Sequence, residues 1–300
     1  METILITTDF SNAGRNATRY GFEFAKSIQA KVILFNAWQF PSTHPESLVY
    51  LPADDLEKCS YQQLANEAEA IDPQRTVALE TQSRRSPVIT SILSVARENN
   101  VSYIIVGMKQ NGKEIRRLFG STVTFLKNES PVPVIVVPEN ARFFIPETIA
   151  LASNMSNEAR CHILDPLKNI AEKFKSKLYV VHVIKKFADE AVERLMISSG
   201  TNMSLKDLQP IYESPINNSI VKAMNAFVRE HVVNMVAVIP QEHNAIEKMF
   251  AGSVTKNLAF NTNVPLLILP AKAPHLSANC LSCKTAMFSE AFKNKADAAR

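Results

Sequence analysis

The chain has 300 residues, a formal net charge of +4, 46% hydrophobic residues and 21% charged residues. This apolar content excludes a wholly disordered chain, and the length predicts roughly two domains. No apolar run reaches the ~18–20 residues that cross a bilayer, and residues 1–10 lack the features of a signal peptide. Because the four cysteines form no disulfide framework, we expect a protein of the reducing cytoplasm. The lack of a long apolar run predicts no membrane partner.

Most of the positive charge lies in the C-terminal tail. From Ala271 onward there are five basic and two acidic residues, so the tail carries +3 and the remaining body +1. A nearly neutral body does not predict a nucleic-acid surface. Cys280 and Cys283 form a lone C-x-x-C pair without a second pair for zinc, so no metal site is predicted.

The first 140 residues alternate between predicted strands and helices. Strands are expected at residues 3–8, 31–38, 76–80, 101–106 and 134–137, and helices at 16–28, 55–70, 86–98 and from about 121. Tyr20, Phe24 and Ile28 stand at helical spacing, and Ser86-Pro87 is typical of a helix start, with serine as the N-cap. Strands that are apolar on both faces predict a parallel sheet covered on both sides.

A repeat accounts for the second half of the chain. Residues 101–138 align without a gap with residues 233–270 at an offset of 132, which places Gly120-Ser121 on Gly252-Ser253. Matching strands are expected at residues 148–152, 177–184, 233–239 and 266–269, although chance similarity between two α/β halves is the alternative.

The predicted fold class is therefore α/β, with two repeated doubly wound domains. Each has a five-stranded, mainly parallel sheet flanked by helices. The expected boundaries are residues 1–140 and 146–271, followed by a basic, flexible tail at 272–300.

Several connections have expected roles. Residues 39–53, with three prolines, are either a lid over a site or an irregular surface loop, and residues 197–209 are expected to be an internal loop. In the link at 139–146, Phe143 and Phe144 are expected to pack. His182 lies in a predicted strand and is expected to be packed or hydrogen-bonded rather than catalytic.

The strongest candidate site follows the strand at 101–106. That strand leads to Gly107, and after a basic loop with Lys109 the sequence Gly120-Ser121-Thr122 opens a helix. Free N–H groups and hydroxyls at a helix start bind anions, and glycine lets the backbone approach them closely. This pattern predicts a phosphate cradle. The alternative is that Ser121 only caps a helix and the charges are solvated.

At these residues the chain resembles the universal stress protein family, in a tandem two-domain form that extends to about residue 271. Nucleotide-binding members have an aspartate at the end of the first strand. After the fourth strand they have Gly, two residues, Gly, nine residues and Gly-Ser/Thr. The first unit matches at Asp9, Gly107, Gly120 and Ser121, while Gln110 replaces the middle glycine.

The second unit departs further from the family pattern. Asn154 stands in place of the aspartate, Ile239 and Glu242 replace the first two glycines, and Gly252-Ser253 is retained. The loop at 240–251 carries a net charge of −1, which repels phosphate. The resemblance therefore implies one nucleotide-binding unit and one degenerate structural unit.

The resemblance implies a Rossmann-like, adenine nucleotide alpha hydrolase-like fold and a stress-response protein that is not an enzyme. The ligand would be ATP or another adenine nucleotide, with or without magnesium. Asp9 would bind its base or ribose side. Phosphate contacts are assigned to Gly107, Lys109, Gly120, Ser121 and Thr122. The alternative is a nucleotide-free scaffold of the same fold.

The resemblance also implies that the fifth strands of the two units pair antiparallel as an internal pseudo-dimer. A homodimer and an unidentified protein partner are further expectations.

Two rival activities are weaker. Residues 107–113 fit the first seven positions of a P-loop, but Glu114 stands where Ser or Thr should hold magnesium. A phosphohydrolase lacks an evident general base beyond Asp9, so no catalytic residue is assigned.

Overall fold

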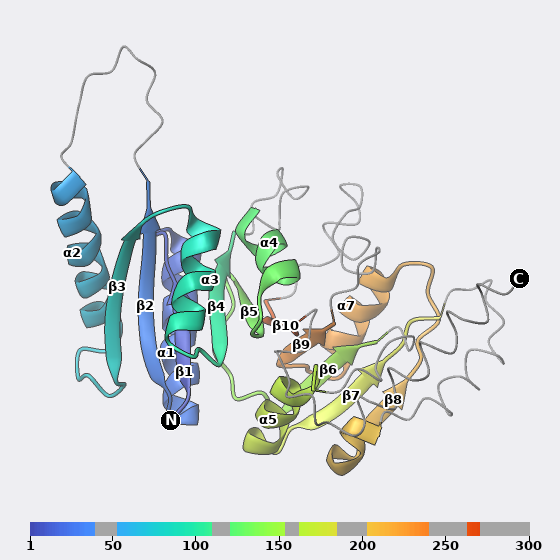
Figure 1. The fold of residues 1–300 in the computed structure, drawn as a ribbon. Helices are drawn as coiled ribbons and strands as arrows, with labels where there is room; N and C mark the ends of the chain where they lie inside the picture. The colour runs from blue at the N-terminus through green and yellow to red at the C-terminus, as the bar shows by residue number, and fades with distance from the viewer. Residues whose placement is uncertain (40–52, 110–120, 154–161, 185–202, 240–262, 271–300) are drawn as a thin grey trace, which may run out of the picture.

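The structure is a computed structural model that describes residues 1–39, 53–109, 121–153, 162–184, 203–239 and 263–270. In these parts of the chain, ten strands form one sheet with helices on both faces (Figure 1). The predicted α/β fold with a mostly parallel sheet is confirmed. Within the segment 39–53, which was expected to be either a lid or an irregular surface loop, residues 40–52 lie outside the described residues, as does the tail with Cys280 and Cys283.

The elements of the first half are β1 (Thr3–Thr7), α1 (Asn12–Ile28), β2 (Lys31–Trp38), α2 (Ala53–Ile71), β3 (Leu79–Arg85), α3 (Val88–Glu98), β4 (Tyr103–Met108), α4 (Ser121–Glu129) and β5 (Val134–Pro138). Those of the second half are β6 (Thr148–Ala152), α5 (Asp165–Phe174), β7 (Lys177–Val181), the 3-10 helix η2 (Met203–Leu208), β8 (Ile211–Glu213), α7 (Ile220–Glu230), β9 (Met235–Val238) and β10 (Leu266–Ile268).

The two halves have the same strand topology. The order in the sheet is β3-β2-β1-β4-β5-β10-β9-β6-β7-β8, so the second half mirrors the first. β4 and β9 begin 132 residues apart, as do β5 and β10, which is the offset of the sequence repeat. β5 and β10 pair antiparallel, with Ile135 opposite Leu267, as the family resemblance implies. Each of these two strands therefore has a neighbour on both sides.

Helix α1 shows how local sequence builds these elements. Ser11 is its N-cap, and the serine hydroxyl accepts a hydrogen bond from Gly14 N at 3.2 Å, so the helix begins before the predicted residue 16. Gln29 ends it in the left-handed conformation, with φ 54°. Tyr20, Phe24 and Ile28 are buried, as their spacing predicts.

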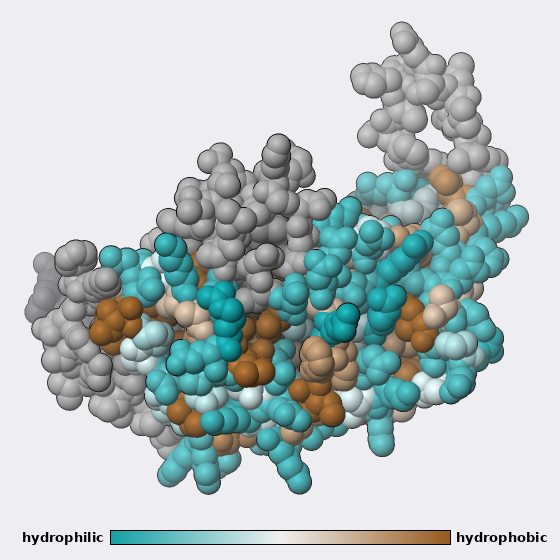
Figure 2. All heavy atoms as spheres, turned by 180° about the vertical axis from the view of Figure 1, so that it is seen from behind, coloured by the Kyte–Doolittle hydropathy of each residue, from teal (hydrophilic) through white to brown (hydrophobic). Residues whose placement is uncertain are grey.

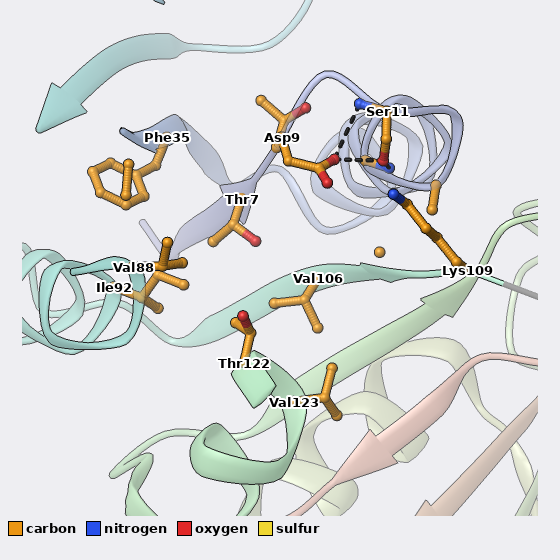
Figure 3. Close-up of a pocket in the computed structure, with 15 residues that line it drawn as sticks. Thr7, Asp9, Ser11, Phe35, Val88, Ile92, Val106, Lys109, Thr122 and Val123 are labelled. Carbon is orange, nitrogen blue, oxygen red and sulfur yellow. Dashed lines mark hydrogen bonds between the residues drawn. The ribbon is translucent and has the colours of Figure 1, made fainter. Parts of the chain in front are cut away.

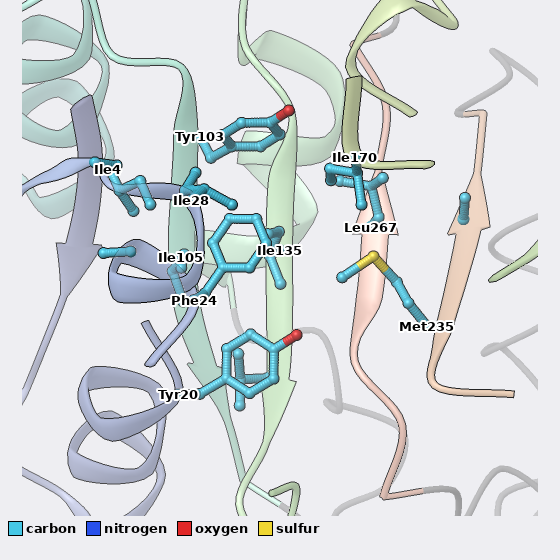
Figure 4. Close-up of a cluster of buried hydrophobic side chains, with 14 of the residues drawn as sticks. Ile4, Tyr20, Phe24, Ile28, Tyr103, Ile105, Ile135, Ile170, Met235 and Leu267 are labelled. Atoms are coloured by element: carbon cyan, nitrogen blue, oxygen red, sulfur yellow. The ribbon is translucent and has the colours of Figure 1, made fainter. Parts of the chain in front are cut away.

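The hydrophobic core lies on both faces of the sheet and is shared by the two halves. One cluster packs under α1, α2 and α5, and the other packs under α3, α4 and α7. Figure 4 shows Phe24 and Ile135 of the first half on the same face of the sheet as Ile170 and Leu267 of the second. Because both clusters contain residues of both halves, apolar burial continues across the β5–β10 pair.

The third strand was wrongly placed from the sequence. It was expected at residues 76–80 but runs from Leu79 to Arg85. β3 pairs with β2 at the edge of the sheet, where polar residues are tolerated, so it lacks a long apolar run. Thr76 instead lies in the turn before β3, where its N–H and its hydroxyl donate hydrogen bonds to the Asp72 carboxylate. The prediction of Ser86 as the N-cap of α3 was also wrong. The helix begins at Val88, and Pro87 occupies the N-cap position.

The second half differs from its prediction in detail. β7 ends at Val181, and Ile184 forms only an isolated bridge to Ile216. Part of the loop expected at residues 197–209 is the 3-10 helix η2, in which Leu205 is fully buried. A fifth strand and flanking helices were expected in this half, but no residue ranges were predicted for β8, α5 and α7.

The two phenylalanines of the link behave differently. Phe143 packs edge-on against Tyr20, with ring centroids 5.3 Å apart, as expected. Phe144 was expected to pack as well but is 62% exposed.

In the view from behind, hydrophobic side chains form small separate groups among hydrophilic ones (Figure 2).

Candidate functional site

A cavity of about 150 Å³ lies at the carboxyl ends of the parallel strands in the first half (Figure 3). It is lined by residues at the ends of β1, β2 and β4 and at the starts of α1, α3 and α4. β1 lies between β2 and β4. The chain continues from β1 to β2 and β3 on one side, whereas β4 and β5 lie on the other side of β1, so the strand order reverses at this point. Open α/β sheets bind ligands at such a switch point, which makes this cavity the candidate site.

The turn between β1 and α1 forms one wall of the cavity. Thr8 Oγ1 accepts a hydrogen bond from Phe10 N at 3.0 Å, and Asp9 Oδ1 accepts bonds from Ser11 N at 3.0 Å and from the Ser11 hydroxyl. Phe10 has φ 60°, a left-handed conformation that is costly for a non-glycine residue. These bonds hold the exposed carboxylate of Asp9 at the cavity wall.

Two glycines allow the start of α1 to lie close to the sheet. A Cβ on Gly107 would be 2.4 Å from the Ala13 carbonyl oxygen, and one on Gly14 would be 2.7 Å from Asp9 Oδ1. Both distances are too short for real contacts, so neither position accepts a larger residue without movement. Gly107 was expected to face an anion, but the missing Cβ would point toward the α1 backbone. Gly14 was missed because it precedes the helix predicted at residues 16–28, whereas in the structure it lies in the first turn of α1.

Two more predicted residues line the same cavity. Lys109 extends from the end of β4 toward Ser11, and Thr122 approaches the cavity from the first turn of α4 (Figure 3). Ser121 is the first residue of α4, and Gly120 lies outside the described residues. Among the described candidates, Asp9, Gly107, Lys109 and Thr122 line one cavity.

An anion is favoured by this arrangement. The first turns of α1 and α4 both border the cavity, and N–H groups at a helix start carry partial positive charge. Lys109 adds a full positive charge, and the Thr122 hydroxyl adds a hydrogen-bond donor. Asp9 supplies a hydrogen-bond acceptor in the same cavity, so the cavity suits a ligand with both an anionic part and a hydrogen-bond donor.

Most positions of the second half that correspond to the candidate site cannot be compared with it. Asn154, Glu242, Gly252 and Ser253 lie outside the described residues, while Ile239 is partly buried against the core. His182 Nδ1 lies 3.1 Å from the Ser153 carbonyl oxygen, which confirms that this histidine is hydrogen-bonded.

The described residues show neither a candidate metal centre nor a candidate membrane span. They contain no group of three or more His, Cys, Asp or Glu side chains that could hold a metal ion. No helix in the described part of the chain is long and apolar enough to span a membrane.

Residues 1–138 match the model of the Universal stress protein family. The match covers the half of the chain that contains the cavity. No curated protein matches the chain.

Solved structures share the fold over most of the chain. A universal stress protein from Archaeoglobus fulgidus is 16% identical, with a TM-score of 0.66, over 89% of this chain and 96% of its own. A putative universal stress protein from Pseudomonas aeruginosa is 11% identical, with a TM-score of 0.55, over 90% of this chain and 93% of its own. At these identities the likeness concerns the fold.

Proposed function

We propose that this protein, whose residues 1–138 carry a domain of the universal stress protein family, is a stress-response protein that binds an adenine nucleotide. ATP is the first candidate, with or without magnesium. The observation that supports this most directly is the cavity at the switch point, where Asp9 faces a basic side chain and two helix starts.

Each residue has a proposed contact. Asp9 accepts a hydrogen bond from the base or ribose, which carry N–H and O–H donors. Lys109, Ser121 and Thr122 contact the phosphates, together with the backbone at Gly107 and Gly120. These are binding contacts, so we propose a binding protein rather than an enzyme.

The wider organisation is part of the same proposal. The chain is a tandem of two family domains, at residues 1–140 and 146–271, which form an internal pseudo-dimer through β5 and β10. The second domain has a structural role, because its pattern has lost the aspartate and two glycines. The nearly neutral body of the chain supports the absence of a nucleic-acid partner, and a cytoplasmic location without a membrane partner is part of the same proposal.

A nucleotide-free scaffold of the same fold is the second candidate function. Two observations favour it. The cavity volume of about 150 Å³ is below the roughly 300–1,000 Å³ that is usual for small-molecule sites. In addition, the space beside Gly107 is closed by the backbone of Ala13.

Calorimetric titration with ATP, with and without magnesium, separates the two candidates. We expect about one ATP per chain, because only the first half retains the aspartate and the basic loop that contains Lys109. Asp9→Asn should weaken binding by about tenfold or more, since a hydrogen bond to a charged group is worth about 1.5–3 kcal/mol.

Asp55→Asn is the matched control, because Asp55 is exposed in the first turn of α2 and does not line the cavity. Absence of binding by the folded wild-type chain would favour the scaffold. Two equivalent sites per chain would contradict the asymmetry.

A further inference from the structure

We propose that Glu67, in α2, is a positioning residue for the nucleotide site: it holds the β1–α1 turn that presents Asp9. The consequence for ligand affinity rests on the proposed function, whereas the effect on the turn does not.

Glu67 is buried in an unusual setting for a carboxylate. Its residue is 8% exposed, and its Oε2 accepts a hydrogen bond from Thr8 Oγ1 at 3.2 Å. Its Oε1 makes a short hydrogen bond with Thr18 Oγ1. Within the described parts of the chain, no Lys or Arg side chain forms an ion pair with Glu67. Its visible partners are therefore two threonine hydroxyls.

These two hydroxyls belong to the two sides of the turn. Thr8 follows β1, and its hydroxyl accepts the N–H of Phe10, the residue in the left-handed conformation. Thr18 lies in α1, and its hydroxyl is 3.1 Å from the Gly14 carbonyl oxygen in the first turn of the helix. Glu67 thus joins the end of β1 to the start of α1, with Asp9 between them.

A second set of bonds from the same region holds the Thr8 backbone. Asn36 Nδ2 donates to the Thr8 carbonyl oxygen at 2.8 Å, and Asn36 Oδ1 accepts from Ser60 Oγ of α2 at 2.9 Å. Ser83 Oγ of β3 donates to Ser60 Oγ at 2.7 Å and accepts from Trp38 Nε1 at 3.0 Å. Helix α2 is therefore connected to Thr8 in two ways. Glu67 bonds the Thr8 hydroxyl directly, and Ser60 is linked to the Thr8 carbonyl oxygen through Asn36.

The chemistry favours a positioning role over simple packing. A buried carboxylate is costly to desolvate, and apolar side chains of similar volume often stabilise an interior as well or better. Each carboxylate oxygen, however, can accept a bond from one hydroxyl, which an apolar group cannot do. The strained φ at Phe10 must be maintained by surrounding contacts, and the Thr8 hydroxyl is one of them.

The test compares Glu67→Gln with Glu69→Gln, an exposed control on the same helix. Glutamine has nearly the same size, but its NH₂ group cannot accept a hydroxyl proton. Amide hydrogen exchange, followed by mass spectrometry on peptides that cover residues 8–15, reports on the turn without any ligand. We expect exchange there to accelerate about tenfold in Glu67→Gln and to stay unchanged in Glu69→Gln.

A second reporter distinguishes a loosened turn from a displaced helix. Trp38 is the only tryptophan of the chain and is hydrogen-bonded within the Ser60–Ser83 network. We expect its emission spectrum to stay unchanged in Glu67→Gln. A shifted spectrum, or unchanged exchange at the turn, would overturn the proposal, because Glu67 would then only dock α2 or would not act on the turn.

Titration with ATP completes the test. If the wild type binds, Glu67→Gln should weaken affinity about tenfold, and an unchanged affinity would overturn the role at the site. If the wild type does not bind but the turn loosens, the proposed function fails while the effect on the turn stands. If Glu67→Gln does not fold, the pair Thr8→Val and Thr8→Ser makes the same comparison: valine should loosen the turn, and serine, which keeps the hydroxyl, should not.

Discussion

Lys173 Nζ in α5 donates a hydrogen bond to the main-chain carbonyl oxygen of Ile28, the last residue of α1, at 2.9 Å. The bond connects the two halves of the chain and places a positive charge at the C-terminal end of α1, where the helix dipole favours it. Close by, Phe24 and Phe174 are in ring contact at 6.2 Å. The Tyr103 hydroxyl donates to the Pro166 carbonyl oxygen at 3.3 Å, and burial raises the pKa of Tyr103, so it stays a neutral donor.

The first prediction concerns this contact between the halves. Lys173→Met should lower the free energy of unfolding by about 1 kcal/mol, since one hydrogen bond and a favourable charge are lost. Lys168→Met, on the same helix, is the control and should be nearly neutral. Urea denaturation measures both. Equal stability of the two variants would show that the Lys173 bond contributes nothing.

The second prediction concerns Gly107. Gly107→Ala should destabilise the chain by about 1–3 kcal/mol even without ligand, because the added Cβ would meet the rigid backbone of Ala13. Lys109→Ala, at the exposed end of the same cavity, should leave stability unchanged. Chemical denaturation tests the pair. A fully stable Gly107→Ala protein would mean that this glycine serves only a ligand.

The third prediction concerns Asn225 in α7. It is 2% exposed, and neither its amide nitrogen nor its amide oxygen has a hydrogen-bond partner among the residues that the structure describes. Asn225→Leu should raise the free energy of unfolding by about 1–3 kcal/mol, because an unsatisfied polar group is replaced by an apolar one of similar size. Asn225→Asp should instead lower it. Thermal melting of the three proteins gives the order, and a destabilised leucine variant would contradict it.

The fourth prediction concerns pH. Hydrogen bonds from Arg84 and then Ser94 lower the pKa of Glu98 from its usual 4.5 to about 2. A carboxylate with a lowered pKa in the folded state stabilises the fold above its unfolded pKa. The contribution is then lost as the pH falls from about 4.5 to about 2. Glu98→Gln should therefore melt below the wild type at pH 7, and the difference should vanish toward pH 2.

Salt provides the check on that interpretation. The Arg84–Glu98 pair is partly solvent-exposed, so 1 M sodium chloride should reduce the difference at pH 7. A difference that persists at pH 2 would have to arise from something other than the charge of Glu98.

The fifth prediction concerns the β5–β10 pair. A fragment of residues 1–140 loses the partner of β5, and Val134 and Ile135 become part of an open sheet edge. We expect the fragment to self-associate through this edge in analytical ultracentrifugation. Ile135→Pro should prevent association, because it removes a ladder donor, provided that circular dichroism shows a folded fragment. A wild-type fragment that is folded and monomeric would argue against this pairing as a driving force.

The repeat and the order of strand and helix were readable from the sequence because they depend on local patterns. β2 runs from Lys31 to Trp38 as predicted, since five of its eight residues are buried and its apolar run has clear ends. β6 also runs from Thr148 to Ala152 as predicted, because its central residues form a buried apolar run with clear ends. By contrast, β3 could not be found by hydrophobicity, because an edge strand buries only part of its surface.

Local sequence patterns were enough to predict two similar α/β units in succession and to select Asp9, Gly107, Lys109 and Thr122 as candidates for one site. The contacts that bring these residues together could be seen only in the folded chain. Gly107 lies against Ala13, and Glu67 reaches Thr8 from a helix 59 residues away, because packing brings distant segments within bonding distance. Periodicity reports which face of an element is buried, but not which neighbour covers it. The partners of a buried polar group therefore emerge only when the sheet and its helices are assembled.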